Sequence, residues 1–243
     1  INKKIKVKNS LKFLTECSSS IRKSSNILCI AITGSSGKTT LKEMIGQLSN
    51  KIFRTYYSKN SYNNKYGVPL SLFNIKRDDK IGVFEVGMDK KGEISYLTKI
   101  LKPNIGVITN ISYAHIKNFK NLFGIARAKS EIINNIVNSG TIILNADDKF
   151  YKYLKLKALS KKLKIISFSK KNKSNLKFNK LKKIGRNYFA NIKFNNKSLN
   201  FLLNKKLENN IENILATLAV ISVFYNIEKL NTKFFNDFKI PQG

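Results

Sequence analysis

The chain has 243 residues, of which 42% are hydrophobic, and its formal net charge is +32. This length suffices for one large α/β domain, and the apolar content supports a buried core rather than a disordered chain. No apolar run reaches the roughly 18 residues of a membrane-spanning helix, and two cysteines, Cys17 and Cys29, are too few for a disulfide framework. We therefore expect a cytoplasmic protein without membrane insertion.

The positive charge has two interpretations. Of the 46 basic residues only five are arginines, and the lysines are spread along the whole chain among abundant Asn, Ile and Phe. Lysine, asparagine, isoleucine and phenylalanine share A/T-rich codons, so a biased genome would produce this composition. Proteins that read nucleic acid instead use arginine for bidentate contacts. We expect a solvated basic surface and no nucleic-acid partner, with a field that attracts phosphorylated or carboxylate substrates.

Strands and helices alternate along most of the chain. Residues 1–26 are polar and read as a linker with a short helix at 10–15. A continuous apolar run at 27–32 predicts a strand buried on both faces, and a helix follows at 39–48. Further strands are predicted at 81–86, 105–109, 141–144 and 165–168, and helices at 93–101, 121–137 and 149–159. This order predicts an α/β fold with a mostly parallel sheet and helices on both faces.

The last third of the chain has a different pattern. Residues 174–203 alternate apolar and polar side chains at period two, with turn residues between the runs. This pattern predicts a small antiparallel β appendage. Helices are predicted at 209–224 and, shorter, at 232–237.

The turn after the first strand has the composition of a phosphate-binding loop. A strand–turn–helix unit presents backbone N–H groups and a helix N-terminus, both of which favour anions. The lysine would neutralise the β- and γ-phosphates of a nucleotide, and the first threonine would bind Mg²⁺. Ile32 stands where the longer spaced pattern has glycine, so the motif is a shortened variant. The candidate phosphate-binding residues are Gly34, Ser35, Ser36, Gly37, Lys38, Thr39 and Thr40.

Two polar residues follow other predicted strands. Glu85 ends the strand at 81–86, and His115, the only histidine, follows the strand at 105–109. Ligands of open α/β sheets gather at the carboxyl ends of the strands, where a carboxylate can reach a metal held by the phosphate loop. The alternatives are a solvated carboxylate for Glu85 and a structural histidine for His115.

Lys129 lies within an apolar stripe of the predicted helix at 121–137. Because an unpaired buried ammonium is costly, such a lysine extends its head group to solvent, pairs with an acid such as Glu131, or is chemically altered. The sequence pattern alone leaves these alternatives open. The segment at 60–70, which includes Asn63 and Asn64, has the composition of an ordinary turn when it is considered by itself.

Five motifs in unbroken order resemble the Mur ligases. They are Ile32–Thr40, Ser61–Leu70, Glu85–Ile94, Ala114–His115 and Ala128–Ile132. The resemblance runs from about residue 27 to the end of the chain. It implies a central ATPase domain at 27–238, with 1–26 linking from an N-terminal UDP-sugar domain and 239–243 starting a hinge to a C-terminal domain. The chain alone is then expected not to catalyse ligation.

The resemblance implies an ATP-dependent amide ligase of peptidoglycan precursor synthesis. In such a ligase ATP phosphorylates the terminal carboxylate of UDP-N-acetylmuramoyl tripeptide, and the amine of D-Ala-D-Ala attacks the acyl phosphate. Mg²⁺ spreads the charge that develops during the transfer. The alternatives are another amide ligase of the superfamily (third-residue-adding ligase, cyanophycin synthetase or folylpolyglutamate synthase) or a nucleic-acid-stimulated NTPase.

The resemblance also assigns residues. It implies catalytic roles for Lys38, Glu85, His115 and Lys129, with Thr39 and Glu85 on one Mg²⁺ and His115 and a carbamylated Lys129 serving a second. Asn63 and Asn64 correspond to substrate-binding positions, and Asn210 and Asn213 to positions near the adenine. The sequence departs from the family at Leu207, Asn209 and Asp89, where the family has Gly, His and often Asn. We further expect a monomer.

Overall fold

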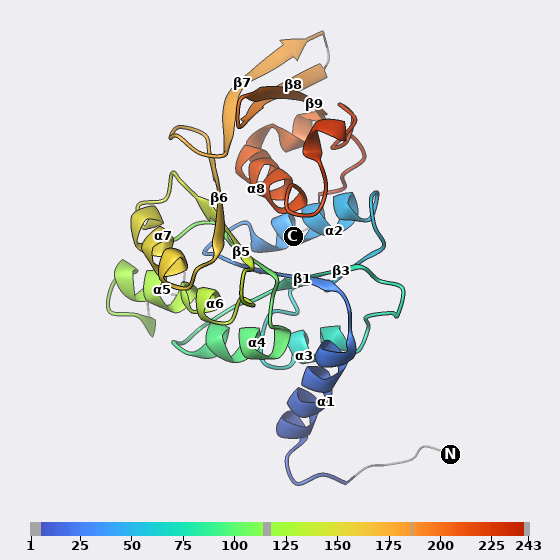
Figure 1. Ribbon diagram of the computed structural model, residues 1–243, viewed down its shortest axis with the longest axis vertical. Coiled ribbons are helices and arrows are strands. Elements are labelled where there is room, and N and C mark those ends of the chain that lie inside the picture. Colours follow the sequence, from blue (N-terminus) through green and yellow to red (C-terminus); the bar gives the residue numbers. More distant parts are fainter. Residues whose placement is uncertain (1–5, 114–117, 186, 241–243) are drawn as a thin grey trace.

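The computed structural model describes residues 6–113, 118–185 and 187–240, and these form one α/β domain around a nine-stranded sheet (Figure 1). The strand order is β2-β3-β1-β4-β5-β6-β7-β8-β9, and neighbouring strands are parallel from β2 to β7 and antiparallel from β7 to β9. The strands are β1 (Leu28–Thr33), β2 (Thr55–Tyr57), β3 (Ile81–Glu85), β4 (Ile105–Ile108), β5 (Thr141–Asn145), β6 (Lys164–Ser169), β7 (Leu176–Ile184), β8 (Asn187–Phe194) and β9 (Lys197–Leu203).

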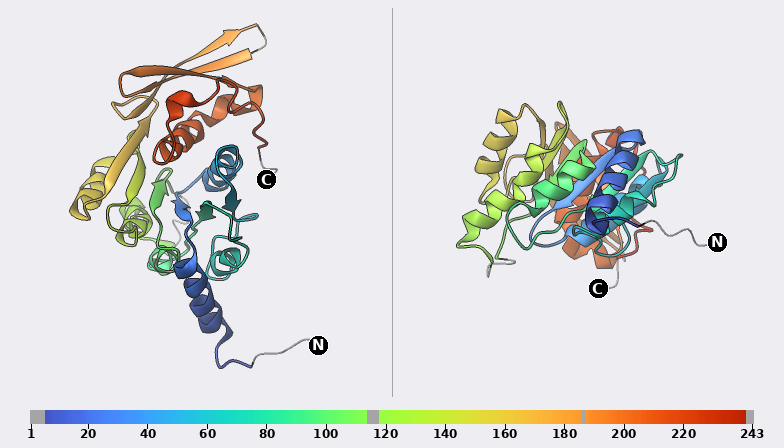
Figure 2. Two further views of the ribbon diagram at one scale, coloured as in Figure 1. Left: turned by 45° about the vertical axis from the view of Figure 1, so that its right-hand side comes forward. Right: turned by 90° about the horizontal axis from the view of Figure 1, so that it is seen from below.

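Helices cover both faces of the sheet, as the continuous apolar strands predict. Helices α2 and α8 pack on one face, and α3 to α7 pack on the other, each with its own apolar core (Figures 1 and 2). The helices are α1 (Ser10–Ser24), α2 (Lys38–Ser49), α3 (Gly67–Leu72), α4 (Glu93–Leu101), α5 (Leu122–Lys129), α6 (Glu131–Asn134), α7 (Tyr151–Ser160) and α8 (Ile211–Ile221), with 3₁₀ turns η2 (Lys205–Asn210) and η3 (Ile227–Lys229). The predicted fold class is confirmed.

Helix α1 is longer than the predicted helix at 10–15. Asn9 caps it by accepting a hydrogen bond from Lys12 N at 2.9 Å. Near its other end, Arg22 donates to the carbonyls of Leu101 and Lys102 at 2.6 and 3.2 Å. The helix thus packs on α3 and α4, and these tertiary contacts override the low helix propensity of its serines. The role of residues 1–26 as a linker and of 239–243 as a hinge stays a prediction.

The antiparallel strands differ from the prediction in their attachment. Strand β7 pairs in parallel with β6, at Phe168 with Leu176 and Ser169 with Lys177, so β7–β9 extend the main sheet. Residues 232–237, predicted as a short helix, form turns instead. The predicted helix at 121–137 is interrupted at Ser130, where Ile133 N bonds the Ser130 carbonyl three residues back rather than four.

The sheet topology brings three strand ends together. Strands β3, β1 and β4 are neighbours and parallel, so their carboxyl ends lie at one edge, where α/β domains bind ligands. The turn at 34–37 follows the central one of these strands. No helix in the described part of the chain is long and apolar enough to cross a membrane.

Candidate functional site

The turn between β1 and α2 has the backbone geometry of a phosphate-binding loop. Gly34 has φ of 152° and Gly37 has φ of 76°, conformations that favour glycine. Gly37 is the N-cap of α2, and no side chain of the described residues caps this end of the helix. The first N–H groups of α2 are therefore available to bind an anion.

The end of strand β4 holds this loop in place. Thr109 Oγ1 donates to the Ser36 carbonyl at 2.8 Å, and Asn110 Oδ1 accepts from Ser36 N at 3.1 Å. The Asn110 carbonyl accepts from Ser35 N at 2.9 Å. The sequence assigned no role to Thr109 or Asn110. The signal that predicts them is their place directly after a buried strand beside β1.

Glu85 is buried at the end of β3, with only 1% of its surface exposed. Thr39 Oγ1 donates to Glu85 Oε2 at 2.7 Å, and Asn63 Nδ2 donates to Glu85 Oε1 at 2.8 Å. Both carboxylate oxygens therefore have fixed partners, and Glu85 is not a solvated carboxylate. The structure brings Thr39 and Glu85, two predicted ligands of one Mg²⁺, into direct contact.

Lys38 and Lys129 approach the same carbonyl from two sides. Lys38 Nζ donates to the Gly34 carbonyl at 3.1 Å, and Lys129 Nζ donates to it at 2.9 Å. Lys129 is 2% exposed. Burial, and secondarily the charge of Lys38, lowers the pKa of Lys129 from 10.5 to about 7. An amine with this pKa is largely neutral at slightly alkaline pH and is then a nucleophile.

The structure excludes two alternatives for Lys129. Its ammonium does not extend to solvent, and within the described residues its only hydrogen-bond acceptor is the Gly34 carbonyl. Glu131 instead accepts from the backbone N–H groups of Gly92 and Ser95, at the N-terminus of α4. An ion pair between Lys129 and Glu131 is therefore absent.

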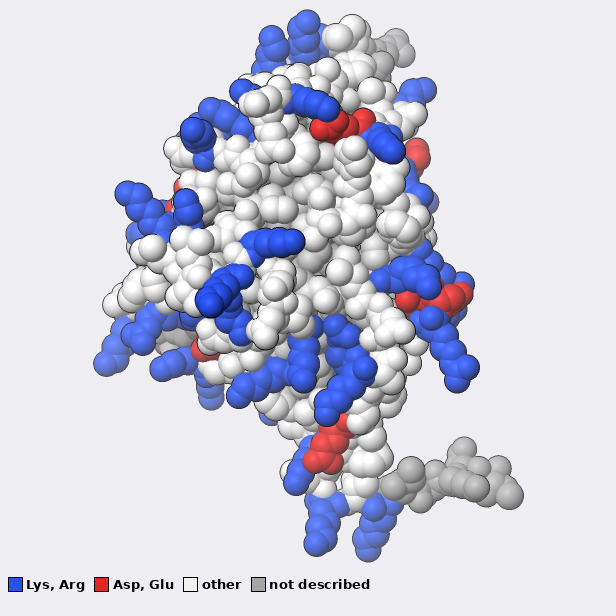
Figure 3. All heavy atoms as spheres, viewed as in Figure 1, with Lys and Arg blue, Asp and Glu red and all other residues white. Residues whose placement is uncertain are grey.

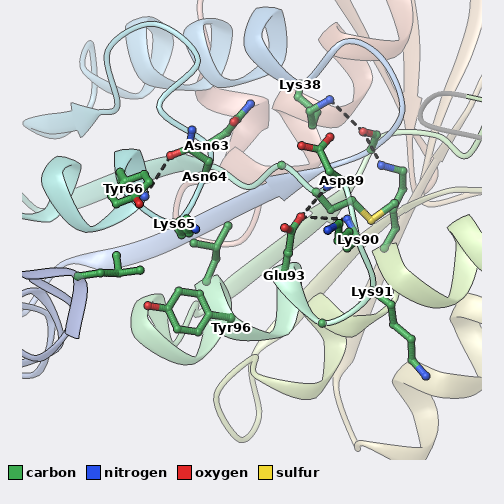
Figure 4. A pocket seen from close by; sticks show the side chains of 17 residues that line it. Lys38, Asn63, Asn64, Lys65, Tyr66, Asp89, Lys90, Lys91, Glu93 and Tyr96 are labelled. Atoms are coloured by element: carbon green, nitrogen blue, oxygen red, sulfur yellow. Dashed lines mark hydrogen bonds between the residues drawn. The ribbon is translucent and has the colours of Figure 1, made fainter. Parts of the chain in front are cut away.

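A cavity of about 780 Å³ opens beside the phosphate loop (Figure 4). Asn63, Asn64 and Tyr66 enter it from the loop before α3, and Glu93 and Tyr96 enter from α4. Asn64 Oδ1 accepts from the N–H groups of Tyr66 and Gly67, at 3.0 Å each, and so satisfies two backbone donors at the start of α3. The cavity is rich in lysine, with Lys38, Lys65, Lys90, Lys91 and Lys129 against the acidic Asp89 and Glu93.

A second cavity, of about 380 Å³, lies on the other side of the loop. It is lined by Ser36 and Gly37, by Asn209 and Asn210 at the end of η2, and by Asn213 near the start of α8. A β-carbon built at Gly37 would lie 3.2 Å from Asn213 Oδ1, which places this side chain directly over the loop. The predicted phosphate and base positions therefore share one cavity.

The predicted second Mg²⁺ site includes His115, which lies outside the described residues, so this site stays a prediction. Within the described residues, no group of three or more His, Cys, Asp or Glu side chains could hold a metal ion. The candidates for Mg²⁺ beside the loop are the carboxylate of Glu85 and the hydroxyl of Thr39, a set that leaves positions for phosphate oxygens and water.

These features together define an α/β domain with the geometry of a phosphate-binding loop. The Mur ligase middle-domain family matches residues 32–221, and the chain therefore belongs to the Mur ligase family.

Relatives within the family match most or all of the chain. The UDP-N-acetylmuramoyl-tripeptide–D-alanyl-D-alanine ligase of Rickettsia prowazekii is 33% identical over 245 residues, covering 100% of this chain and 54% of the relative. The crystal structure of MurF from Acinetobacter baumannii is 28% identical, with a TM-score of 0.86 over 100% of this chain and 53% of its own. The structure of MurF ligase from Thermotoga maritima in complex with ADP, 23% identical, shares the fold with a TM-score of 0.80 over 92% of this chain and 52% of its own. The chain spans about half the length of these relatives.

Proposed function

We propose that this chain is the nucleotide-binding part of an ATP-dependent ligase that adds D-Ala-D-Ala to UDP-N-acetylmuramoyl tripeptide. The observation that carries the proposal is the buried contact between Thr39 and Glu85 beside an uncapped α2 N-terminus. The relatives with this name and the MurF structures support the substrate assignment. Such a ligase works in the cytoplasm on peptidoglycan precursors, and we propose that it acts as a monomer.

The loop fits the phosphates of ATP. The N–H groups at the start of α2 bind phosphate oxygens, and Lys38 neutralises their charge. Thr39 and Glu85 supply the hydroxyl and carboxylate oxygens that Mg²⁺ prefers, and bound Mg²⁺ spreads the charge of the transferred phosphoryl group. The Thermotoga maritima MurF, which shares this fold, is in complex with ADP, and this supports an adenine nucleotide as the ligand. Asn210 and Asn213 then lie on the side of the base, with Asn209 in the position of the family histidine.

Lys129 fits a carbamate. Its neutral amine attacks CO₂, the new N–C bond forms, and the amine proton leaves to solvent. The product exchanges a buried cation for an anion with two oxygen atoms. Because Lys129 and Lys38 share the Gly34 carbonyl, this anion would lie beside the phosphate loop and the Lys38 ammonium. Together with His115, it would serve a second Mg²⁺.

The larger cavity fits an anionic substrate. The cavity is lined by five lysines and by two acidic residues. This excess of positive charge favours the diphosphate and carboxylates of a UDP-muramoyl peptide. Asn63 and Asn64 reach this cavity and stay candidates for contacts with that substrate. Figure 3 shows basic side chains scattered over one face of the molecule rather than gathered into one patch, which disfavours a nucleic-acid interface.

The test is substrate-dependent phosphate release by the product of the complete gene. We expect release from ATP only when UDP-N-acetylmuramoyl tripeptide and D-Ala-D-Ala are both present, with the coupled product identified by mass. Activity with a different acceptor pair would indicate a sister ligase. Hydrolysis that DNA or RNA stimulates and muramoyl peptide does not affect would refute the proposal. The 243-residue chain alone should bind nucleotide without ligating, since ligation needs reactants positioned and water excluded.

A further inference from the structure

One fully buried lysine lies outside the residues assigned so far. Lys42 is on α2, one turn after Lys38, and its exposed fraction is 0%. Its Nζ donates to the Ser58 carbonyl at 2.5 Å and to the Asn60 carbonyl at 2.7 Å, and it pairs with Glu43 Oε1 at 3.0 Å. A buried ammonium persists only where hydrogen bonds and an opposite charge compensate its lost hydration, and all three contacts do so here.

The packing of α2 directs this lysine to the end of β2. Gly46 lies one turn further along the same helix face, and a β-carbon built there would lie 2.3 Å from the Tyr57 ring. This close approach brings α2 against Tyr57, the last residue of β2, and Lys42 reaches the next residue, Ser58. The contact is thus fixed by helix packing rather than by a flexible surface side chain.

Lys42 anchors the segment that leads to Asn63. We name residues 58–64 the β2–α3 loop. Between residues 59 and 62, the bond from Lys42 to the Asn60 carbonyl is the only hydrogen bond to another element among the described residues. Asn60 itself has φ of 46°, a left-handed conformation that asparagine tolerates better than most residues. Without Lys42, residues 59–62 would keep their packing of Tyr62 against Gly67 but would lose this hydrogen bond to another element.

The far end of this loop contacts the proposed metal ligand. The Asn63 carbonyl accepts from Gly87 N at 2.8 Å, and the Asn63 amide donates to Glu85 at 2.8 Å. We infer that Lys42 is a positioning residue: its ammonium fixes the β2–α3 loop so that Asn63 orients Glu85 for Mg²⁺. This inference rests on the proposed role of Glu85. Partners that orient a metal ligand commonly change metal affinity by about 10- to 100-fold when they are lost.

The test measures ADP binding to the chain as Mg²⁺ is varied, and it compares the Mg²⁺ concentration that gives half-maximal binding. Lys42→Met keeps most of the length of the side chain and removes its charge; it is expected to lower stability, because Glu43 and the Ser58 and Asn60 carbonyls lose their partner. We expect it to raise the required Mg²⁺ by about tenfold. The control Lys99→Met, which removes the same charge from an exposed position of α4, should leave the requirement unchanged. Lys42→Gln, which keeps a neutral donor, is the second variant if Lys42→Met does not fold, and it should show a smaller increase.

A double variant separates positioning from general structure. If Lys42 acts through Asn63, then Lys42→Met should add little to the effect of Asn63→Ala, whereas independent effects would multiply. In the nucleotide-free chain, hydrogen exchange at residues 59–63 should be faster in Lys42→Met, with α2 unchanged. Multiplying effects, an unchanged Mg²⁺ requirement or unchanged exchange would overturn the inference. Failure of the wild-type chain to bind ADP with Mg²⁺ would instead overturn the proposed function, and the exchange result would still decide the role of Lys42 in the loop.

Discussion

Replacing Gly34 by alanine tests whether the phosphate loop needs glycine for both its backbone and its space. The new β-carbon would lie 1.8 Å from Thr109 Oγ1, 3.0 Å from Thr109 Cβ and 3.1 Å from Thr109 N. The Thr109 side chain cannot easily move away, because it is buried and its hydroxyl donates to the Ser36 carbonyl. Gly34→Ala therefore strains both the loop and the end of β4.

The expected cost has two parts. The φ of 152° is a region that side chains rarely adopt, which costs about 1–3 kcal/mol. Inserting a methyl group into a packed position costs about 1–3 kcal/mol more. Gly92 is the matched control, because it has φ of 93° but no atom within 4 Å of a built β-carbon. Gly92→Ala carries the backbone cost alone, so Gly34→Ala should destabilise the chain by about 1–3 kcal/mol more.

Urea denaturation of the two variants and the wild-type chain measures this difference. We expect the free energy of unfolding to fall in both variants, and further in Gly34→Ala. ADP binding should be lost in Gly34→Ala and retained in Gly92→Ala. Equal destabilisation by the two substitutions would show that the contact with Thr109 has no energetic effect, contrary to this prediction.

Three further predictions concern the two lysines of the site. Lys38→Ala should abolish nucleotide turnover in the complete gene product while its thermal unfolding stays near wild type, since Lys38 supplies charge rather than packing; unchanged turnover would exclude it from the site. Lys129→Ala should lose ligase activity and regain part of it with added formate or acetate, and near-normal activity without rescue would make Lys129 structural. Because the pKa of Lys129 falls from 10.5 to about 7 on folding, the unfolded chain binds more protons between these values. The stability of the metal-free chain should thus rise as pH increases from about 7 toward 10.5, by at most about 1.4 kcal/mol per pH unit, and denaturation of Lys129→Met across this range should lack the rise.

The parts of the fold set by local patterns were predictable from the sequence. The continuous apolar runs mark the parallel strands because a strand covered on both faces needs no polar alternation. The helix at 93–101 matches α4 at both ends. Helix α1 was predicted too short, because its extent depends on Arg22 and on packing against α3 and α4, contacts between distant residues that no local pattern contains.

The candidate site was predictable in its residue types but not in its connections. The apolar stripe of its helix marked Lys129 as unusual, yet only the structure shows that its ammonium reaches the Gly34 carbonyl rather than Glu131. The sequence did not single out Lys42, because one lysine in a chain with 46 basic residues is expected to lie on the surface. Its burial follows from the close contact of Gly46 with Tyr57, a consequence of helix packing.

A crystal structure of the chain with ADP and Mg²⁺ tests the proposed nucleotide site most directly. We expect the β-phosphate to lie against the N–H groups of residues 37–40 and the ion to contact Thr39 Oγ1 and Glu85. A nucleotide bound away from this loop, or an ion that contacts neither side chain, would overturn the proposed site.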